Sequence, residues 1–316
     1  MPPRSLGPVG LALDVLAPLG DRAVPDGPIG ALSTYRVGGS AALRVTVGSL
    51  GDLELVADAV KVSGLATIVM GRGSNMLVAD AGFAGVVVLL DTVDFGRVEI
   101  DGDRVCAGGA AALPTLARRS VEAGLTGMEW AVGVPGSVGG GVRMNAGGHG
   151  SEISHTLASA TVFDLAAPQP SRTTVTSASQ LALGYRRSNL ADSQVVIDAA
   201  FDLGAGDPDS GRRKIAEIVR WRRENQPGGQ NSGSVFKNPP GESAGRLIDL
   251  AGLKGLRVGT AAMSAKHANF IQADEGGSAD DVAALIALVQ RRVRERLSVE
   301  LCPEVRMVGF QSGGSV

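Results

Sequence analysis

The residues with the clearest chemical meaning are the glycines of one 24-residue segment, 127–150, which reads GMEWAVGVPGSVGGGVRMNAGGHG. Glycine adopts positive φ without strain, and its peptide N–H groups can approach another molecule without an intervening Cβ. Apolar residues such as Trp130 and Val142 recur through the segment, whereas flexible linkers are glycine-, serine- and polar-rich. We therefore predict an anchored loop, containing little ordinary helix or strand, that wraps a large planar or phosphorylated ligand.

A second glycine loop, GRGSNMLVAD, spans 71–80 and follows a strand-like run. Its two glycines, serine and asparagine can present several donors to one point, which is what a diphosphate requires. The loop lacks the third glycine of the dinucleotide fingerprint, and the chain has no lysine-containing P-loop, so a tight structural turn is the alternative. Two glycine loops that each follow an α/β pattern favour a dinucleotide cofactor held mainly by backbone.

Polar side chains between glycine and proline breaks form the second group of candidates. Ser234 and Asn238 are placed to reach a polar ligand, with Lys237 between them as a source of positive charge. No Ser-His-Asp order or GxSxG elbow accompanies Ser234. Glu304 stands among apolar neighbours, where a carboxylate is costly unless paired, so a salt bridge to Arg306 or another arginine is the alternative to a role in chemistry.

Strand and helix patterns that position these residues alternate along the chain. Helix-like patterns begin at Asp52, which is a candidate cap, and at Pro114, and the last helix begins after Ser278 with an apolar stripe up to Leu297. A boundary is expected near 204–211. Further helices are expected near 214–223 and 244–250, and strands near 42–47, 66–70, 85–90, 97–109, 160–165 and 194–203, with a hairpin region between the last two.

Composition limits the class of protein. The 316 residues are 44% hydrophobic and 20% charged with a formal net charge of −2, which predicts a globular chain of two or three units with no general attraction for nucleic acid or anionic membrane. No apolar run reaches the length of a membrane span, and the proline- and aspartate-rich start is unlike a secretory signal, so we expect a cytoplasmic protein. Cys106 and Cys302 lack CxxC spacing, so we expect two buried thiols and no disulfide or metal site.

Eight spaced segments, taken in order, resemble the UDP-N-acetylenolpyruvoylglucosamine reductases (MurB), flavoenzymes of bacterial peptidoglycan synthesis. The resemblance covers nearly all of the chain after its N-terminal arm, and seven or eight matches in the right order are far more specific than any one of them. The segments are TYRVGG at 34–39, GRGSNMLV at 71–78, GVPGSVGGGVRMNAGGHGSEI at 133–153, YRRS at 185–188, GSVFKNP at 233–239, LIDLAGLKGLRVG at 247–259, SAKHANFI at 264–271 and PEVRMVG at 303–309.

The resemblance implies an α+β fold, in which an FAD-binding PCMH-type (vanillyl-alcohol-oxidase-like) unit of two α/β subdomains precedes a C-terminal α+β substrate domain. The implied parts are an N-terminal arm (1–30), FAD-binding subdomain 1 (31–95), FAD-binding subdomain 2 (96–204), a substrate-binding domain (205–303) and a C-terminal segment returning to the active site (304–316). The implied cofactor-binding residues are Arg36, Gly71, Arg72, Gly73, Ser74, Asn75, Met76, Leu77, Gly133, Pro135, Gly136, Ser137, Gly139, Gly140, Asn145, Ala146, Gly147, Gly150 and Ile153.

The implied reaction needs FAD and NADPH. In such reductases NADPH reduces the flavin and leaves, and the flavin N5 then delivers hydride to C3 of UDP-N-acetylglucosamine enolpyruvate, giving UDP-N-acetylmuramate after protonation at C2. The resemblance gives Arg186 and Glu304 the task of polarising the substrate carboxylate, Glu304 as a protonated or proton-sharing group, and Ser234 that of protonating C2. No nucleic acid, membrane or obligate protein partner is implied.

Substrate-binding positions carry over with departures. The resemblance assigns Tyr185, Arg222, Lys237, Asn238, Lys254 and His267 to the substrate. Only 47 residues separate Arg186 from Ser234, as in the shorter branch that lacks an inserted tyrosine loop. Asn225 stands where many relatives have a phosphate-binding lysine, so Arg222, Arg223 or Lys237 would take that role.

Two other functions remain open at this point. An FAD-linked alcohol or sugar oxidase of the same fold could share both glycine loops but has no need for GSVFKNP and PEVR. A non-catalytic nucleotide-sugar-binding protein could use the same cleft without redox chemistry.

Overall fold

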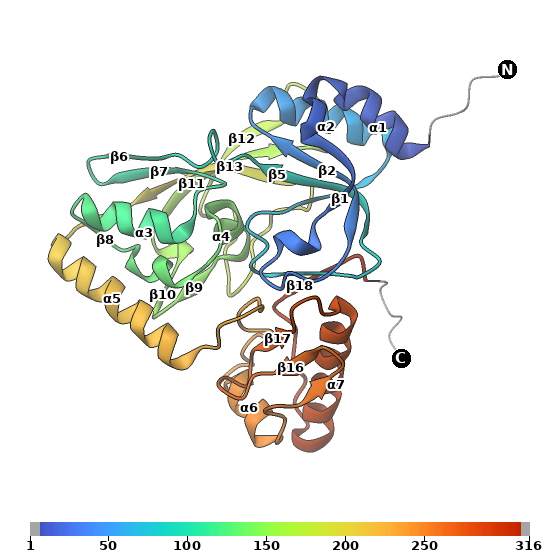
Figure 1. Ribbon diagram of the computed structural model, residues 1–316. Coiled ribbons are helices and arrows are strands. Elements are labelled where there is room, and N and C mark those ends of the chain that lie inside the picture. Colours follow the sequence, from blue (N-terminus) through green and yellow to red (C-terminus); the bar gives the residue numbers. More distant parts are fainter. Residues whose placement is uncertain (1–6, 311–316) are drawn as a thin grey trace. The chain divides into compact units, whose positions relative to one another are not determined.

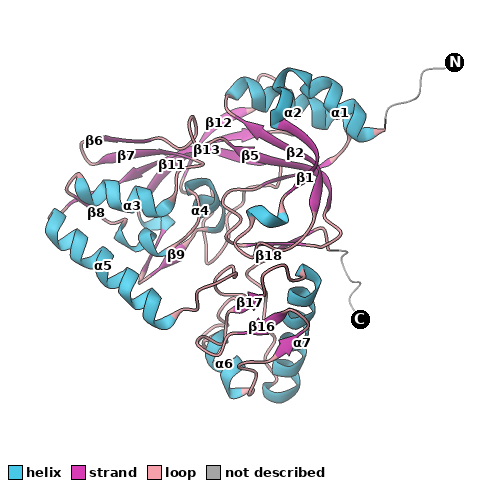
Figure 2. Ribbon diagram, in the orientation of Figure 1, coloured by secondary structure: helices cyan, strands magenta, loops and turns pink. Residues whose placement is uncertain are grey.

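The computed structural model describes residues 7–310, which form two compact units that interleave along the sequence (Figures 1 and 2). Unit 1 takes its described residues from 7–27, 42–72 and 84–221, and unit 2 takes its own from 28–41, 73–83 and 222–310. This division follows packing, and the five-part domain division expected from the sequence remains a prediction. The last six residues of the expected C-terminal segment and the first six of the expected arm lie outside the described residues.

The first layer of unit 1 is a four-stranded sheet covered by two helices. Its strand order is β1-β2-β5-β3, and β3 and β5 are parallel. Alternate residues of β2, including Leu43 and Val45, are fully buried and pack with Leu16 and Leu53 of the two helices. The strands are β1 Ala23–Pro28, β2 Ser40–Val47, β3 Ala66–Val69 and β5 Phe83–Leu90, and the helices are α1 Pro8–Leu16 and α2 Leu50–Ser63, which lie side by side in Figure 1.

Two local features of this layer differ from the sequence prediction. Ser49, not Asp52, is the cap of α2, because the Ser49 hydroxyl accepts from Asp52 N at 3.1 Å while the Asp52 carboxylate turns to Gly48 N and Arg22. The helix ends at Gly64 with φ +67°. The proline-rich start forms α1, the short 3-10 helix Ala17–Arg22 and β1, none of which the sequence pattern predicted.

The second layer is an antiparallel five-stranded sheet with order β12-β11-β13-β7-β6. Val195 and Ile197 of β13 face the core shared with the first sheet, and Val196 faces the opposite core, as the two-residue period of a strand requires. The expected hairpin region is confirmed as β11–β12. The strands are β6 Val98–Asp101, β7 Arg104–Gly108, β11 Leu157–Asp164, β12 Thr173–Ser177 and β13 Gln194–Asp202.

The long glycine segment is more regular than predicted, because it contains the helix α4 (Val138–Met144). Ser137 caps α4 by accepting from Gly140 N, Val138 and Val142 are fully buried, and a Cβ on Gly141 would come 3.2 Å from Leu113, so glycine permits close packing here. The surrounding elements are α3 Leu113–Glu122, β8 Leu125–Thr126, the 3-10 helix Glu129–Gly133, β9 Gly147–Gly148, β10 Ser151–Glu152, the 3-10 helix Ile153–His155, β14 Gly204–Ala205 and α5 Pro208–Asn225.

Unit 2 has its own core, to which three separate stretches of the chain contribute. Tyr35, Leu77 and Phe236 are buried together with Val289 of the last helix. Strands β4 and β18 pair in parallel, with Leu77 opposite Met307. The elements are the 3-10 helix Gly30–Leu32, β4 Met76–Val78, α6 Ala244–Leu250, the sheet of β15 Arg257–Val258, β16 Ala261–Met263 and β17 Ile271–Ala273, α7 Ala279–Leu297 and β18 Arg306–Val308.

The prediction that the last helix begins after Ser278 is confirmed, because the Ser278 hydroxyl accepts from Asp281 N at 3.2 Å and caps α7. The expected burial of the two cysteines is wrong, because both Cys106 and Cys302 are exposed. Cys106 occupies an outward position of β7, and Cys302 lies outside regular structure.

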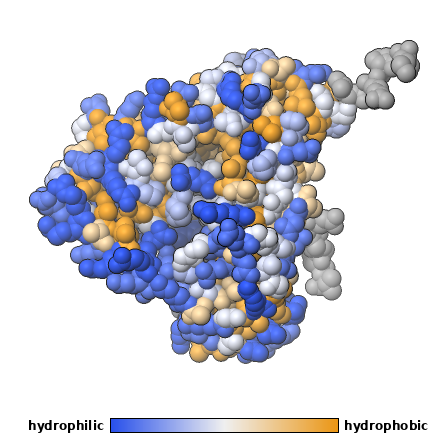
Figure 3. All heavy atoms as spheres, in the orientation of Figure 1, coloured by the Kyte–Doolittle hydropathy of each residue, from blue (hydrophilic) through white to orange (hydrophobic). Residues whose placement is uncertain are grey.

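None of the described helices is long and apolar enough to cross a membrane. The face seen in Figure 3 mixes hydrophilic and hydrophobic side chains.

Candidate functional site

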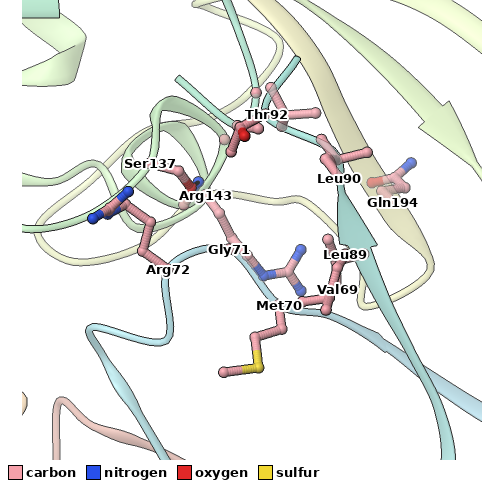
Figure 4. Close-up of a pocket in the computed structure, with 15 residues that line it drawn as sticks. Val69, Met70, Gly71, Arg72, Leu89, Leu90, Thr92, Ser137, Arg143 and Gln194 are labelled. Carbon is pink, nitrogen blue, oxygen red and sulfur yellow. Dashed lines mark hydrogen bonds between the residues drawn. The ribbon is translucent and has the colours of Figure 1, made fainter. Parts of the chain in front are cut away.

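A pocket in unit 1 lies where several strands end against the start of α4 (Figure 4). Five of the predicted cofactor-binding residues line it, namely Gly71, Arg72, Ser137, Gly139 and Gly140. The sequence reasoning did not assign the others: Val69, Met70, Leu89, Leu90, Thr92, Gly109, Ala110, Arg143, Gln194 and Val196. Several of these close the ends of β3, β5 and β7, so their place at strand ends was the signal that could have found them.

The two glycine loops meet at this pocket. An added Cβ on Gly71 would lie 2.5 Å from Ser137 Oγ, and one on Gly139 would lie 3.1 Å from the Gly109 carbonyl oxygen. Arg72 Nε donates to the Pro135 carbonyl at 3.2 Å, which ties the first loop to the second. Glycine is required at these positions by close approach, so backbone faces the pocket with little side-chain cover.

The donor set of this pocket suits an anionic dinucleotide. Gly139 N donates to the Gly109 carbonyl and Gly140 N to Ser137 Oγ, so these backbone donors are used within the protein. The guanidinium groups of Arg72 and Arg143 come from opposite segments of the pocket lining. Arg143 is itself oriented by hydrogen bonds to the Ala191 carbonyl and Asp192. The two arginines fit an anionic diphosphate, and nearby apolar residues such as Leu90 and Val196 suit an attached ring.

A second polar cluster of unit 1 surrounds Arg186. Arg186 Nη2 donates to the Gly147 carbonyl at 3.1 Å, and its guanidinium lies 5.2 Å from the Tyr185 ring centroid. Asn145, fully buried at φ +42°, donates to Glu152 and to the Gly184 carbonyl. The side chain of Asn145 therefore holds the loop together, and its role toward a cofactor remains a prediction.

Glu152 is the acidic member of this cluster. Hydrogen bonds from the Ser154 hydroxyl first and the Asn145 amide second, together with the positive charge of Arg186, lower its pKa below the ordinary value despite some burial. Glu152 is therefore ionised at neutral pH and fixes the turn that carries Gly147 and Arg186.

Three segments distant in sequence converge on Ser234 and Glu304 within unit 2. Glu304 N donates to the Val235 carbonyl at 2.7 Å, and Lys237 N donates to the Cys302 carbonyl at 2.9 Å, so the two segments run side by side. Asn75 Nδ2 donates to the Glu304 carbonyl at 3.1 Å. Ser234, Glu304 and Asn75, predicted from separate motifs, are thus brought together.

The loop that carries Ser234 is fixed by its neighbours. Asn231 Oδ1 accepts from Gly233 N at 3.1 Å, and Gly233 has φ +77°, a conformation that favours glycine. On the other side Val235 is fully buried, and its N–H donates to the Asn269 carbonyl. Ser234 is half-buried at the junction between this turn and the core.

The predicted substrate residues of unit 2 are partly committed to protein contacts. His267 Nδ1 accepts from Asn269 N, so its Nε2 carries the proton when the ring is neutral, and burial followed by the charge of Lys254 lowers the pKa of His267. Lys254 Nζ lies 3.0 Å from Asp249 Oδ2. Asn238 Oδ1 accepts from Ala244 N at the start of α6.

Arg222 is the half-buried member of the basic group at the end of α5. Its Nε donates to Gln226 Oε1 at 2.8 Å, and burial lowers its pKa from the usual high value.

Two residues predicted to bind cofactor, Met76 and Leu77, are buried in β4 of unit 2, with Leu77 in its core. Their side chains therefore support the fold there.

Known proteins resemble the chain over most of its length. The "FAD binding domain" family matches residues 41–167, and the "UDP-N-acetylenolpyruvoylglucosamine reductase, C-terminal domain" family matches 225–308. A UDP-N-acetylenolpyruvoylglucosamine reductase of Rubrobacter xylanophilus is 40% identical over 286 residues, which cover 90% of this chain and 94% of that protein. The chain belongs to the UDP-N-acetylenolpyruvoylglucosamine reductase family. The family resemblance expected from the sequence motifs is confirmed.

Solved structures agree with this family membership. The crystal structure of the reductase (MurB) from Thermus caldophilus has a TM-score of 0.77 and 35% identity, covering 90% of this chain and 98% of that one. A BBE-like 1 protein of Physcomitrella patens has a TM-score of 0.56 at 12% identity, a likeness of fold alone. The predicted fold, an FAD-binding α/β unit with a C-terminal α+β domain, is confirmed, and as a member of this family the chain is an FAD-dependent oxidoreductase.

Proposed function

We propose that this reductase converts UDP-N-acetylglucosamine enolpyruvate to UDP-N-acetylmuramate, with NADPH as the source of electrons and FAD as the resident cofactor. The observation that carries the proposal is the convergence of Ser234, Glu304 and Asn75 in unit 2. Alkene reduction beside a carboxylate needs both a proton donor and a charge partner, which a serine and a glutamate on adjoining backbone segments would supply, whereas an alcohol oxidase needs neither.

The cofactor side of the proposal rests on the pocket of unit 1. The FAD diphosphate would lie against the small residues Gly71, Gly139 and Gly140, with Arg72 and Arg143 supplying positive charge. When bound, the reduced flavin supplies the hydride that adds to C3 of the enolpyruvyl group.

The chain's own residues would do the remaining chemistry on the substrate. Arg186, already oriented by Gly147 and Tyr185, would bind the substrate carboxylate, and Glu304 would share a proton with it as negative charge builds. Ser234 Oγ would give its proton to C2, a step that a hydroxyl can perform because the acceptor carbon is strongly basic. Lys237, Lys254 and His267 would contact the UDP-sugar, and Arg222 or Lys237 would take its diphosphate.

An anaerobic two-step absorbance experiment tests the proposal. The yellow protein is bleached with NADPH, and UDP-N-acetylglucosamine enolpyruvate is then added under anaerobic conditions. We expect the visible flavin band to return with one equivalent of substrate. A protein that stays colourless when FAD is supplied, or a reduced flavin that only oxygen reoxidises, would point to the nucleotide-sugar-binding or oxidase alternative respectively.

A further inference from the structure

Two exposed rings lie against each other on unit 1, away from the pocket of Figure 4. Trp221, one turn before the end of α5, is 45% exposed, and the His149 ring meets it edge to face with centroids 5.1 Å apart. The other tryptophan, Trp130, is 2% exposed. An exposed indole held by a helix on one side and by the glycine segment on the other offers a flat amphipathic surface to a ligand.

Printed contacts connect this ring pair to the predicted catalytic arginine. Arg186 donates to the carbonyl of Gly147, two residues before His149, and also lies over the ring of Tyr185, which is 49% exposed. All of these residues belong to unit 1. Three exposed aromatic side chains therefore border one loop, and that loop also orients Arg186.

The backbone of the loop fixes the position of the imidazole ring. His149 has φ +53°, a conformation that costs free energy for any residue other than glycine and persists only where its surroundings hold it. Gly148 and Gly150 flank it, and a Cβ on either would meet nothing within 4 Å. Space for a neighbouring group therefore lies beside the two glycines that flank His149.

We propose that Trp221, with His149 holding its ring, stacks on the uracil base of the UDP-sugar and so selects the nucleotide. The inference rests on the proposed function, because Arg186 would hold the carboxylate end of the same molecule, and its base needs a partner of its own. An aromatic face stacks well on a planar base.

Steady-state kinetics of Trp221→Leu test the stacking role. We expect KM for the UDP-sugar to rise about tenfold, equivalent to ~1.4 kcal/mol, while kcat and KM for NADPH stay unchanged. Trp221→Phe, which keeps an aromatic face, should recover most of the loss. Val219→Ala is the matched control, because Val219 is 44% exposed on the same helix but two residues away, on a different face.

A second measurement reads ligand binding without turnover. In a Trp130→Phe background Trp221 is the only tryptophan, so its emission can be followed in the oxidised FAD-loaded enzyme. UDP should change that emission saturably, whereas inorganic pyrophosphate should not. A saturable response to NADP⁺ with none to UDP would assign the ring pair to the reductant and overturn the inference.

The outcomes separate this inference from the function on which it rests. If substrate fails to reoxidise the wild-type flavin, the proposed function is wrong. If wild-type reoxidation proceeds but Trp221→Leu leaves KM for the UDP-sugar unchanged, only the stacking inference is wrong. Two further results together would also count against stacking. The first is a Trp221→Leu protein that loses flavin or melts at a lower temperature, and the second is a Trp221→Phe protein whose KM for the UDP-sugar matches that of Trp221→Leu.

Discussion

At the scale of residues, the Arg186 side chain and the Glu304 backbone, both proposed for the site, are each held by two neighbouring groups. Arg186 is fixed by the Gly147 carbonyl and the Tyr185 ring, and the Glu304 backbone is fixed by Val235 and Asn75. Such prior positioning matters because catalysis gains most from groups that need not reorganise as charge develops. The residue-scale predictions therefore concern what each side chain does once it is held in place.

Ser234→Ala should separate the two half-reactions. The variant has no hydroxyl proton for C2, so we expect reoxidation by substrate to slow by about 10²–10⁴-fold, the usual contribution of a positioned acid. Flavin bleaching by NADPH should keep its normal rate, as stopped-flow absorbance will show. Ser120→Ala, which removes a buried hydroxyl bonded only to the Leu116 carbonyl of α3, is the control. Loss of bleaching in a folded Ser234→Ala protein would rule out the assigned role.

Glu152 should make the stability of the folded chain sensitive to acid. Hydrogen bonds from Ser154 and Asn145 lower the pKa of Glu152 below its ordinary value, so the unfolded chain takes up the proton first as pH falls. The contribution of Glu152 to stability is fully present above the ordinary glutamate pKa and is lost as pH falls through the lower pKa of the folded state. Glu152→Gln should flatten the free energy of unfolding against pH in that range, measured by urea unfolding, and exposed Glu300→Gln is the control. The prediction would be contradicted if the free energy of unfolding of Glu152→Gln changed with pH as steeply as that of the wild-type protein.

The sequence assigned residues to a site but could not predict the contacts that those residues make. Motifs placed Asn145, Arg186 and Glu304 in one functional set, because residue type and order survive in a linear pattern. The sequence could not predict that Asn145 would turn to Gly184, 39 positions away, or that His267 would commit Nδ1 to Asn269. Those contacts depend on how distant segments pack, which a local pattern does not encode.

At the scale of elements, glycine acts through close approach rather than through disorder. The glycine segment was predicted to avoid helix, yet α4 forms because Ser137 caps it and Val142 anchors it in the core. The spacing of apolar residues in the sequence did predict α7 and β13, because a long apolar pattern reflects which residues are buried. The spacing of apolar residues could not predict short elements such as α4, whose stability depends on a cap and on packing against neighbouring segments.

Gly71 and Ser137 should behave as a coupled pair. A Cβ at position 71 would meet Ser137 Oγ at 2.5 Å and nothing else within 3.4 Å, so Gly71→Ala must displace the hydroxyl that caps α4, which costs about 1 kcal/mol. Ser137→Ala loses the same cap, and adding Gly71→Ala to it should then cost little more. Urea unfolding of the two single variants and of the double variant gives the double-mutant cycle. The affinity for FAD should also fall in Gly71→Ala. Additive losses would show that the contact is not the cause.

At the scale of the whole molecule, the chain crosses repeatedly between two compact units. Strand β4 from the N-terminal part pairs with β18 near the end, and Tyr35, Val37 and Leu77 enter a core otherwise built from residues beyond 222. The sequence suggested consecutive domains because patterns are read in order. Contacts between residues over two hundred positions apart leave no periodic trace, so the interleaving could not be predicted.

The interleaving predicts that residues 222–316 alone will not fold cooperatively. The fragment lacks the partner of β18 and loses Val37 and Leu77, each worth about 1.5–3 kcal/mol when buried. Tyr35, also fully buried, is lost as well. Because a domain of this size is stable by only about 5–15 kcal/mol in all, these losses should abolish its transition. Thermal unfolding of the fragment by circular dichroism should show a gradual slope where the full chain shows a sharp midpoint. A sharp midpoint in the fragment would mean that the C-terminal residues fold without the segments that the structure places among them.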